Sequence, residues 1–204
     1  MTASAIDFYF ACSSPWSYLA TARLQAIAAS HGRMVAYRPI DVGRAWSTTG
    51  GGRPMDQRPQ VALDYRLVEL PRWRAFRDVR LNTEPAHFPV DHWLSSRVIA
   101  AARLDGADVY PLTLAMMQGC WADELNIADP DTVSGIADKA GFDGKKLLAA
   151  AQDPAVDAAI AADTDALMAV GGWSVPSIVV DGELFFGQDR LELIEWRLNG
   201  GRNG

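Results

Sequence analysis

The chain carries strand-type patterns only near its two ends, and the long stretch between them has the periodicity of helices. Residues 5–11 alternate as a strand does, residues 15–30 repeat apolar side chains at helical spacing, and residues 34–40 read as a second strand. A strand–helix–strand unit of this length predicts two parallel strands joined by a crossover helix. From about residue 60 to residue 168 only helical periodicity is found.

The strand pattern returns after Gly171-Gly172. The sequence "VPSIVVDGELFFG" predicts two strands joined by a two-residue turn at Asp181-Gly182, and residues 188–198 predict a short amphipathic helix. The element order is therefore β-α-β, a block of helices, then β-β-α. This order predicts an α/β fold of the thioredoxin-like type, with a four-stranded mixed sheet and a large all-helical insertion.

The same pattern suggests a division into two domains. We expect a discontinuous thioredoxin-like domain at residues 1–46 and 169–204, and an inserted helical domain at residues 47–168. Residues 47–59, "STTGGGRPMDQRP", are expected to form a loop, because a glycine run and two prolines oppose regular structure.

Charge and composition limit which kinds of partner the protein can bind and where in the cell it is expected. The formal net charge is −6 and no run of five basic residues occurs, which argues against nucleic acid or an anionic membrane as the main partner. No apolar run reaches the ~18 residues of a membrane span. The N-terminal residues lack the features of a signal peptide, so we expect a cytoplasmic protein.

The cysteines and histidines do not predict a redox pair or a metal site. Cys12 and Cys120 are far apart, belong to no C-x-x-C motif, and are expected to stay reduced. Neither they nor the three histidines have the spacing of metal ligands. The residues give no reason to expect a bound metal.

The stretch "SSPWS", residues 13–17, lies where the first predicted strand meets the first predicted helix. Pro15 suits the first position of that helix, and Ser14 suits its N-cap. The free N–H groups and the dipole of a helix N-terminus favour an anion by ~0.3–1 kcal/mol. Ser14 is therefore either a simple helix cap or part of an anion site.

Four stretches together carry a family resemblance. They are "DFYFACSSPWSYLA", "DYRLVELPRW", "FPVDHWLSSR" and "VPSIVVDGELFFGQDRLELIE". Together they resemble the 2-hydroxychromene-2-carboxylate isomerases and the related kappa-class glutathione transferases, over nearly the whole chain. The chain departs from the family pattern at four places: Ala62 stands where a Lys is frequent, Gly50–Gly52 where an Asn is frequent, Asp91 replaces Asn, and Ser174 replaces Gly.

The resemblance implies glutathione as cofactor. Ser14 and Ser17 take the places of the two cysteines in the C-P-x-C turn of disulfide oxidoreductases, so redox cycling at this turn is lost. A hydrogen bond from Ser14 would favour the thiolate of bound glutathione and lower its pKa from about 8.5. The resemblance further implies that the peptide lies along the residues Val175, Pro176, Phe186, Gly187, Gln188 and Asp189. Pro176 would be the cis-proline of the fold, or an ordinary strand-start proline, and Asp189 would bind the γ-glutamyl end or merely favour a helix start.

The second substrate is expected between the thioredoxin-like part and the insertion. Candidates are Arg44, Trp46 and Ser47, which follow the second strand, together with Asp91 and His92. Arg44 could hold a substrate carboxylate and His92 could move a proton. Each also has a structural reading, such as Trp46 covering the core.

These features predict a glutathione-dependent isomerase of the 2-hydroxychromene-2-carboxylate type, acting on an aromatic carboxylate in the degradation of aromatic compounds. The alternatives are a kappa-type glutathione transferase, a thiol-disulfide oxidoreductase-like protein that has lost its redox cysteines, and a non-catalytic module that binds thiol peptides. Relatives are commonly dimeric, so the resemblance also implies a homodimer.

Overall fold

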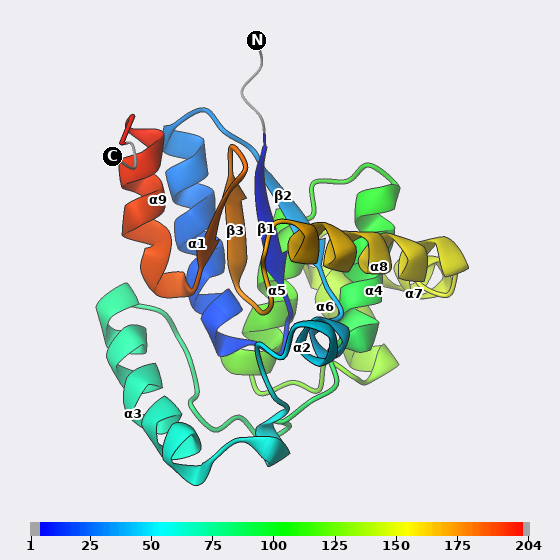
Figure 1. Ribbon diagram of the computed structural model, residues 1–204. Helices are drawn as coiled ribbons and strands as arrows, with labels where there is room; N and C mark the ends of the chain where they lie inside the picture. Colours follow the sequence, from blue (N-terminus) through cyan, green and yellow to red (C-terminus); the bar gives the residue numbers. More distant parts are fainter. Residues whose placement is uncertain (1–4, 202–204) are drawn as a thin grey trace.

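The computed structural model describes residues 5–201, which form a four-stranded mixed sheet surrounded by helices. The strands lie in the order β2-β1-β3-β4, and β1 pairs in parallel with β2 and antiparallel with β3 (Figure 1). The bounds are Ile6–Phe10 for β1, Val35–Pro39 for β2, Ser177–Val180 for β3 and Glu183–Phe186 for β4. The predicted thioredoxin-like sheet is confirmed; the division into two domains stays a prediction.

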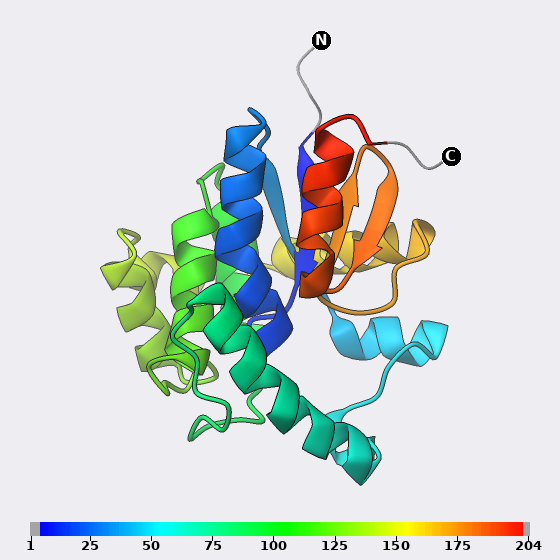
Figure 2. The ribbon, with the colours of Figure 1, turned by 90° about the vertical axis from the view of Figure 1, so that its left-hand side faces the viewer.

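The helices follow the predicted order, with one addition. Their bounds are Pro15–Ser30 (α1), Val42–Thr49 (α2), Gln60–Arg77 (α3), Trp93–Leu104 (α4), Tyr110–Trp121 (α5), Pro130–Lys139 (α6), Gly144–Ala150 (α7), Pro154–Ala169 (α8) and Leu191–Leu198 (α9). Two short 3-10 helices lie at Met55–Gln57 and Gln188–Arg190. Figure 2 shows α1 and α9 side by side in front of the sheet. None of the helices within residues 5–201 is long and apolar enough to cross a membrane.

The two faces of the sheet pack against different helices because side chains alternate along β1. Phe8 and Phe10 are fully buried in the large cluster that includes residues of α1 and α5. Tyr9 and Ala11 point to the other face and join a second cluster with residues of α2 and α8, including Leu167. Burial of both faces explains why the strand is almost continuously hydrophobic.

The expectation of a loop over residues 47–59 is wrong in part. Helix α2 extends to Thr49, and a 3-10 turn occupies Met55–Gln57. The helix starts because the Asp41 carboxylate accepts a hydrogen bond from the backbone N–H of Arg44 (2.9 Å), and it ends at Gly50, which has φ of 71°. The helix therefore begins before the glycine run, which only terminates it.

The predicted turn and cap signals are confirmed where they depend on local chemistry. Asp129 and Asp153 cap α6 and α8, and a proline follows each of them. Asp181 and Gly182 both have positive φ, as the two-residue hairpin turn between β3 and β4 requires. Each aspartate cap contributes about 1 kcal/mol.

A buried carboxylate ties the insertion to the sheet. The side chain of Asp163 on α8 is 6% exposed and forms ion pairs with Arg38 on β2 (2.8 Å) and Arg103 on α4 (2.5 Å). Arg38 also binds Asp7 on β1 at 2.7 Å. Because the Asp163 carboxylate is shielded from water, both arginines depend on it for charge compensation.

We predict that Asp163→Asn lowers the free energy of unfolding by about 2 kcal/mol, since it leaves two half-buried arginines without their shared partner. Asp123→Asn is the matched control, because the pair of Asp123 with Arg80 is largely exposed and should contribute less than about 1 kcal/mol. Urea denaturation followed by circular dichroism measures both. Equal losses in the two variants would contradict the role given to Asp163.

Candidate functional site

Ser14 lies at the start of α1, directly after the end of β1. Its Oγ accepts a hydrogen bond from the backbone N–H of Ser17 at 3.1 Å, so Ser14 is the N-cap of the helix. Because Oγ serves as the acceptor in that bond, the hydroxyl hydrogen can still be donated to a ligand. Ser17 is fully buried, and its hydroxyl has no partner within the described residues.

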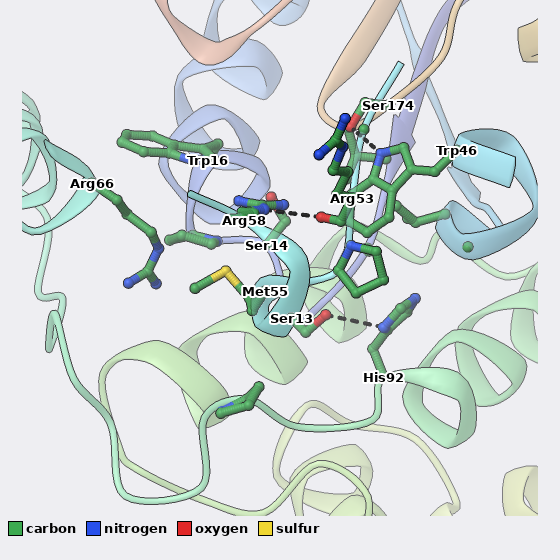
Figure 3. A pocket seen from close by; sticks show the side chains of 18 of the residues that line it. Ser13, Ser14, Trp16, Trp46, Arg53, Met55, Arg58, Arg66, His92 and Ser174 are labelled. Atoms are coloured by element: carbon green, nitrogen blue, oxygen red, sulfur yellow. Dashed lines mark hydrogen bonds between the residues drawn. The ribbon is translucent and has the colours of Figure 1, made fainter. Parts of the chain in front are cut away.

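Ser14 lines a cavity of about 660 Å³ at the end of the sheet. The other side chains that shape it include Ser13, Trp16, Trp46, His92 and Ser174 (Figure 3). The walls come from the start of α1, from α2 and the segment that follows it, from the start of α4, and from the segment before β3. We call this cavity the first compartment.

A second compartment of about 360 Å³ adjoins the first. It is bounded by α3 and by the turn from β4 into the last helix, including Gly187, Gln188 and Asp189. The two compartments share the residues Trp16, Arg58, Arg66, Val175 and Phe186. They are therefore two halves of one cleft.

The residues that the resemblance assigns to glutathione binding all line this cleft. Ser14 lines the first compartment, Val175 and Phe186 line both, and Pro176 lines the second. The peptide bond between Val175 and Pro176 is cis. The antiparallel pairing of Tyr9 with Ser177 places this bond across from the start of α1.

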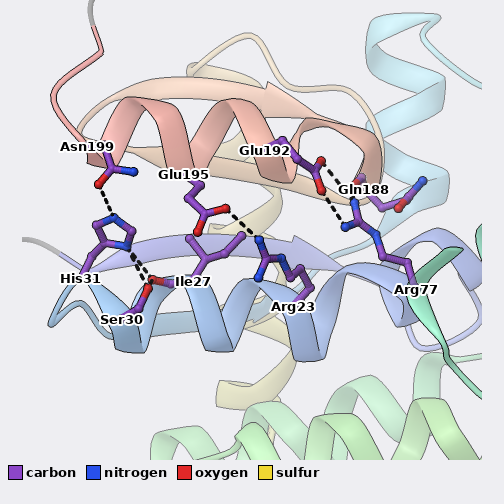
Figure 4. A network of polar contacts seen from close by, with 9 residues as sticks. All are labelled: Arg23, Ile27, Ser30, His31, Arg77, Gln188, Glu192, Glu195 and Asn199. Carbon is purple, nitrogen blue, oxygen red and sulfur yellow. Dashed lines mark hydrogen bonds and ion pairs between the residues drawn. The ribbon is translucent and has the colours of Figure 1, made fainter.

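Gln188 and Asp189 present polar groups at the far end of the second compartment. Gln188 is 3% exposed, and its side-chain Oε1 has no hydrogen-bond partner within the described residues. Its backbone carbonyl accepts a hydrogen bond from Arg77 at 3.4 Å, and Arg77 also pairs with Glu192 at 2.6 Å (Figure 4). Arg77, which ends α3, therefore holds this turn in place.

Gly187 is required by its backbone conformation, and a larger residue would also displace the Asp189 carboxylate. Its φ is 105°, and a Cβ at this position would lie 2.4 Å from a carboxylate oxygen of Asp189. Its N–H donates to the carbonyl of Pro176 at 2.9 Å, which joins the two loops that bound the second compartment.

Of the five candidates for the second substrate, Trp46 and His92 line the cleft and three do not. Arg44 turns outward, where its guanidinium pairs with Asp165 and donates to the carbonyl of Ala161. The Ser47 hydroxyl donates to the carbonyl of Arg44, and Asp91 accepts from the backbone N–H of Trp93. These three side chains are used by local contacts.

Trp46 and His92 are both fixed by partners distant in sequence. The indole Nε1 of Trp46 donates to the Ser174 hydroxyl at 3.0 Å. Nδ1 of His92 lies 3.0 Å from the Ser13 hydroxyl. Burial lowers the pKa of His92, although the carboxylates of Asp91 and Asp41 oppose the shift, so the imidazole is neutral at pH 7.

Sequence reasoning missed Ser13 and three arginines of the cleft, Arg53, Arg58 and Arg66. A signal existed for two of them: Arg58 and Arg66 each lie four residues from Ala62, the position where the family frequently has a Lys. That spacing places Arg66 on the same face of α3 as Ala62. The pairing of Ser13 with His92, 79 residues apart, has no counterpart in the local sequence.

The cysteines lie outside the cleft. Cys12 and Cys120 are free and buried, and burial raises the pKa of each thiol to about 12. Neither thiol lines either compartment. The described residues therefore offer no reactive thiol of their own beside Ser14.

Comparisons with known proteins agree with this arrangement. Residues 5–199 match the family of DSBA-like thioredoxin domains. The chain is 30% identical over 190 residues to a 2-hydroxychromene-2-carboxylate isomerase of Sphingobium xenophagum, covering 93% of this chain and 95% of the relative. It is 27% identical to the enzyme of the same name from Pseudomonas putida, covering 93% and 92%.

The solved structures give the same result. A 2-hydroxychromene-2-carboxylate isomerase structure superposes with a TM-score of 0.81 at 25% identity, covering 96% of this chain and 95% of that one. A probable DsbA oxidoreductase from Streptomyces coelicolor shares the fold, with a TM-score of 0.72 at 20% identity and coverage of 98% and 92%. The resemblance found in the sequence motifs is thus confirmed over nearly the full chain: the protein belongs to the DSBA-like thioredoxin domain family and, within it, to the 2-hydroxychromene-2-carboxylate isomerases.

Proposed function

We propose that this protein is a glutathione-dependent isomerase that acts on a 2-hydroxychromene-2-carboxylate or a close aromatic relative. The observation that carries the proposal is the position of Ser14, whose hydroxyl caps α1 inside a cleft that has no protein thiol among its lining residues. A turn that in the oxidoreductases of this fold carries cysteine is here an anion site that needs a sulfur from elsewhere.

The described residues fit glutathione at both ends of the cleft. The partnerless Oε1 of Gln188 and the carboxylate of Asp189 suit the α-ammonium of the γ-glutamyl unit. The backbone of Val175 could pair with the glutathione peptide, which would add to it as an extra strand does. When bound, glutathione would supply a thiolate that adds to the substrate and is released unchanged.

Ser14 and the N-terminus of α1 would stabilise negative charge on that sulfur. The Ser14 hydroxyl would donate a hydrogen bond, and the free N–H groups of the first helical turn would add their dipole. Both interactions favour the charged form of a thiol and lower its pKa.

Ser13 and His92 would transfer protons to and from the substrate in the first compartment, which both line. The neutral imidazole can accept a proton at one ring nitrogen while the other stays bonded to the Ser13 hydroxyl. Opening of the cyclic hemiketal of such a substrate breaks the bond between C2 and the ring oxygen: the ring oxygen leaves as a phenolate that gains a proton, and the C2 hydroxyl loses a proton as the ketone forms. His92 is suited to accept the proton because burial lowers its pKa and so keeps the imidazole neutral at pH 7.

The isomerase and the kappa-type transferase are separated by the fate of glutathione. We predict that free glutathione stays constant during turnover of 2-hydroxychromene-2-carboxylate, and that Ser14→Ala lowers kcat/KM about 10²-fold because a donor to the sulfur anion is lost. Ser30→Ala, at the far end of α1, is the control. Consumption of one glutathione per product would instead identify a transferase, and full activity without glutathione would refute the proposal.

The depressed pKa of His92 gives a pH dependence with a definite sign. The unfolded chain takes up a proton on this residue near pH 6.5, whereas the folded protein does so only at lower pH. Stability should therefore fall as the pH drops below about 6.5. We predict a shallower fall for His92→Gln, measured as the free energy of unfolding at about pH 7.5 and about pH 5. Parallel curves for the two proteins would show that His92 is not buried in its neutral form.

We further propose a homodimer that uses the outer face of α3. This face carries apolar side chains at helical spacing, with Val61 75%, Val68 46% and Phe76 71% exposed. We predict that light scattering gives twice the 22.2 kDa mass of one chain, and that Val61→Glu combined with Phe76→Glu shifts the protein to one chain. A monomer at micromolar concentration for the unaltered protein would contradict this proposal.

A further inference from the structure

The guanidinium of Arg66 is almost fully buried, yet no carboxylate among the described residues forms an ion pair with it. Arg66 is 9% exposed and makes no hydrogen bond or ion pair with any residue that the structure describes. The guanidinium carbon of Arg66 lies 4.7 Å from the ring centre of Phe88 and 5.6 Å from the ring centre of Trp121. Burial, followed by the positive charge of Arg58, lowers its pKa to about 10, although the carboxylate of Glu84 opposes the shift, so the side chain is still a cation at pH 7.

Arg58 approaches the same space from the segment before α3. Its Nε donates to the carbonyl of Arg53 at 2.9 Å, and its guanidinium lies over the ring of Trp46 at 5.5 Å. Burial lowers its pKa as well. Figure 3 shows Arg66 extending from α3 and Arg58 among the other residues that line the cavity.

The acidic side chains of the cleft do not neutralise these two arginines. Asp56 lines the first compartment but forms no ion pair within the described residues. In the second compartment, Glu69 accepts hydrogen bonds from Tyr65, Arg72 and Trp73, and Asp189 pairs with Arg190. Outside the cleft lining, Glu84 acts on Arg66 electrostatically but forms no ion pair with it, so it compensates the charge only in part. A buried charge without a directly bonded partner is costly, so an entering anion would complete the compensation of the two arginines.

The contacts of the two arginines indicate which compartment holds that anion. Phe88, which stacks on Arg66, and Trp46, which stacks on Arg58, line the first compartment only. The residues expected to bind the γ-glutamyl end line the second compartment only. The anion therefore belongs to the occupant of the first compartment.

The chemistry of this compartment specifies the occupant further. A guanidinium is a planar fork that matches the two oxygens of a carboxylate. The walls beside it are flat and apolar, formed by Trp16, Trp46, Phe88 and Phe186. We propose that Arg66, assisted by Arg58, binds the carboxylate of a planar aromatic acid in the first compartment, and so does the task that the sequence suggested for Arg44. This inference deepens the proposed function, since it rests on that acid being the substrate of the isomerase.

Binding without glutathione tests the inference separately from catalysis. Isothermal titration calorimetry would compare 2-naphthoate with 2-naphthamide, which has the same rings but no charge. We expect Arg66→Gln to weaken binding of naphthoate about tenfold or more, with partial rescue in Arg66→Lys. Binding of naphthamide should be the same in all three proteins.

Two further variants keep the test decisive. Arg80→Gln, which alters an exposed arginine outside the cleft, should bind naphthoate like the unaltered protein. Thermal unfolding reports whether Arg66→Gln is folded; if it is not, Arg58→Gln carries the test, with an expected loss of about threefold to tenfold.

Four results would overturn the inference: no binding of naphthoate to the unaltered protein, equal binding in all variants, equal loss for naphthoate and naphthamide, or a loss confined to glutathione affinity. The last result would place the arginines on the glycyl carboxylate of the cofactor. Failure of the proposed function can be distinguished from failure of this inference. In that case naphthoate binding would still depend on Arg66, but turnover would not require glutathione.

Discussion

Strand β1 is hydrogen-bonded on both of its sides, and the geometry of the cleft depends on this double pairing. Its parallel partner β2 leads into α2 and Trp46, and its antiparallel partner β3 begins directly after the cis peptide bond at Pro176. The register that pairs Tyr9 with Ser177 sets Val175 across from the turn that holds Ser14. A shift of one residue would turn the buried aromatic face of β1 toward the wrong helices, so the register is strongly determined.

The electrostatics of the cleft differ from those of the chain as a whole. The protein carries a net charge of −6, yet Arg53, Arg58 and Arg66 surround the first compartment with a single acidic residue, Asp56. Many carboxylates elsewhere have a structural task, as Asp163 does between α8 and the sheet or Asp41 at the start of α2. Local positive potential in an acidic protein attracts an anionic ligand to one place and leaves the rest of the surface unattractive to it.

Helix α1 begins with free N–H groups beside Ser14, where Ser14 and Ser17 cannot form a disulfide. Ser14 and Ser17 have the places of two cysteines, and the two thiols of the described chain are buried with raised pKa values. Exchange of sulfur for oxygen leaves the helix dipole and the free N–H groups unchanged. A cofactor thiol could therefore be activated by the same helix end that stabilises a cysteine thiolate in related folds, which is the basis of the proposed function.

The sequence by itself determined the features that depend on neighbouring residues. These are the order of strands and helices, the hairpin at Asp181-Gly182, the cap at Ser14 and the motif that ends in Gln188-Asp189, since each follows from local periodicity or turn chemistry. The family resemblance also implied that Ser14, Val175 and Asp189 would share one site, and all three line the cleft.

Only the tertiary structure decided which side chains face the cleft. Arg44 is directed away from it because Asp165 and the carbonyl of Ala161, more than a hundred residues later, bind its guanidinium. His92 is directed into it by Ser13, 79 residues earlier. Arg66 is an ordinary helix residue in the sequence and becomes a buried cation only because Phe88 and Trp121 enclose it. The physical reason is the same in each case: the direction of a long side chain is set by partners that come close only after folding.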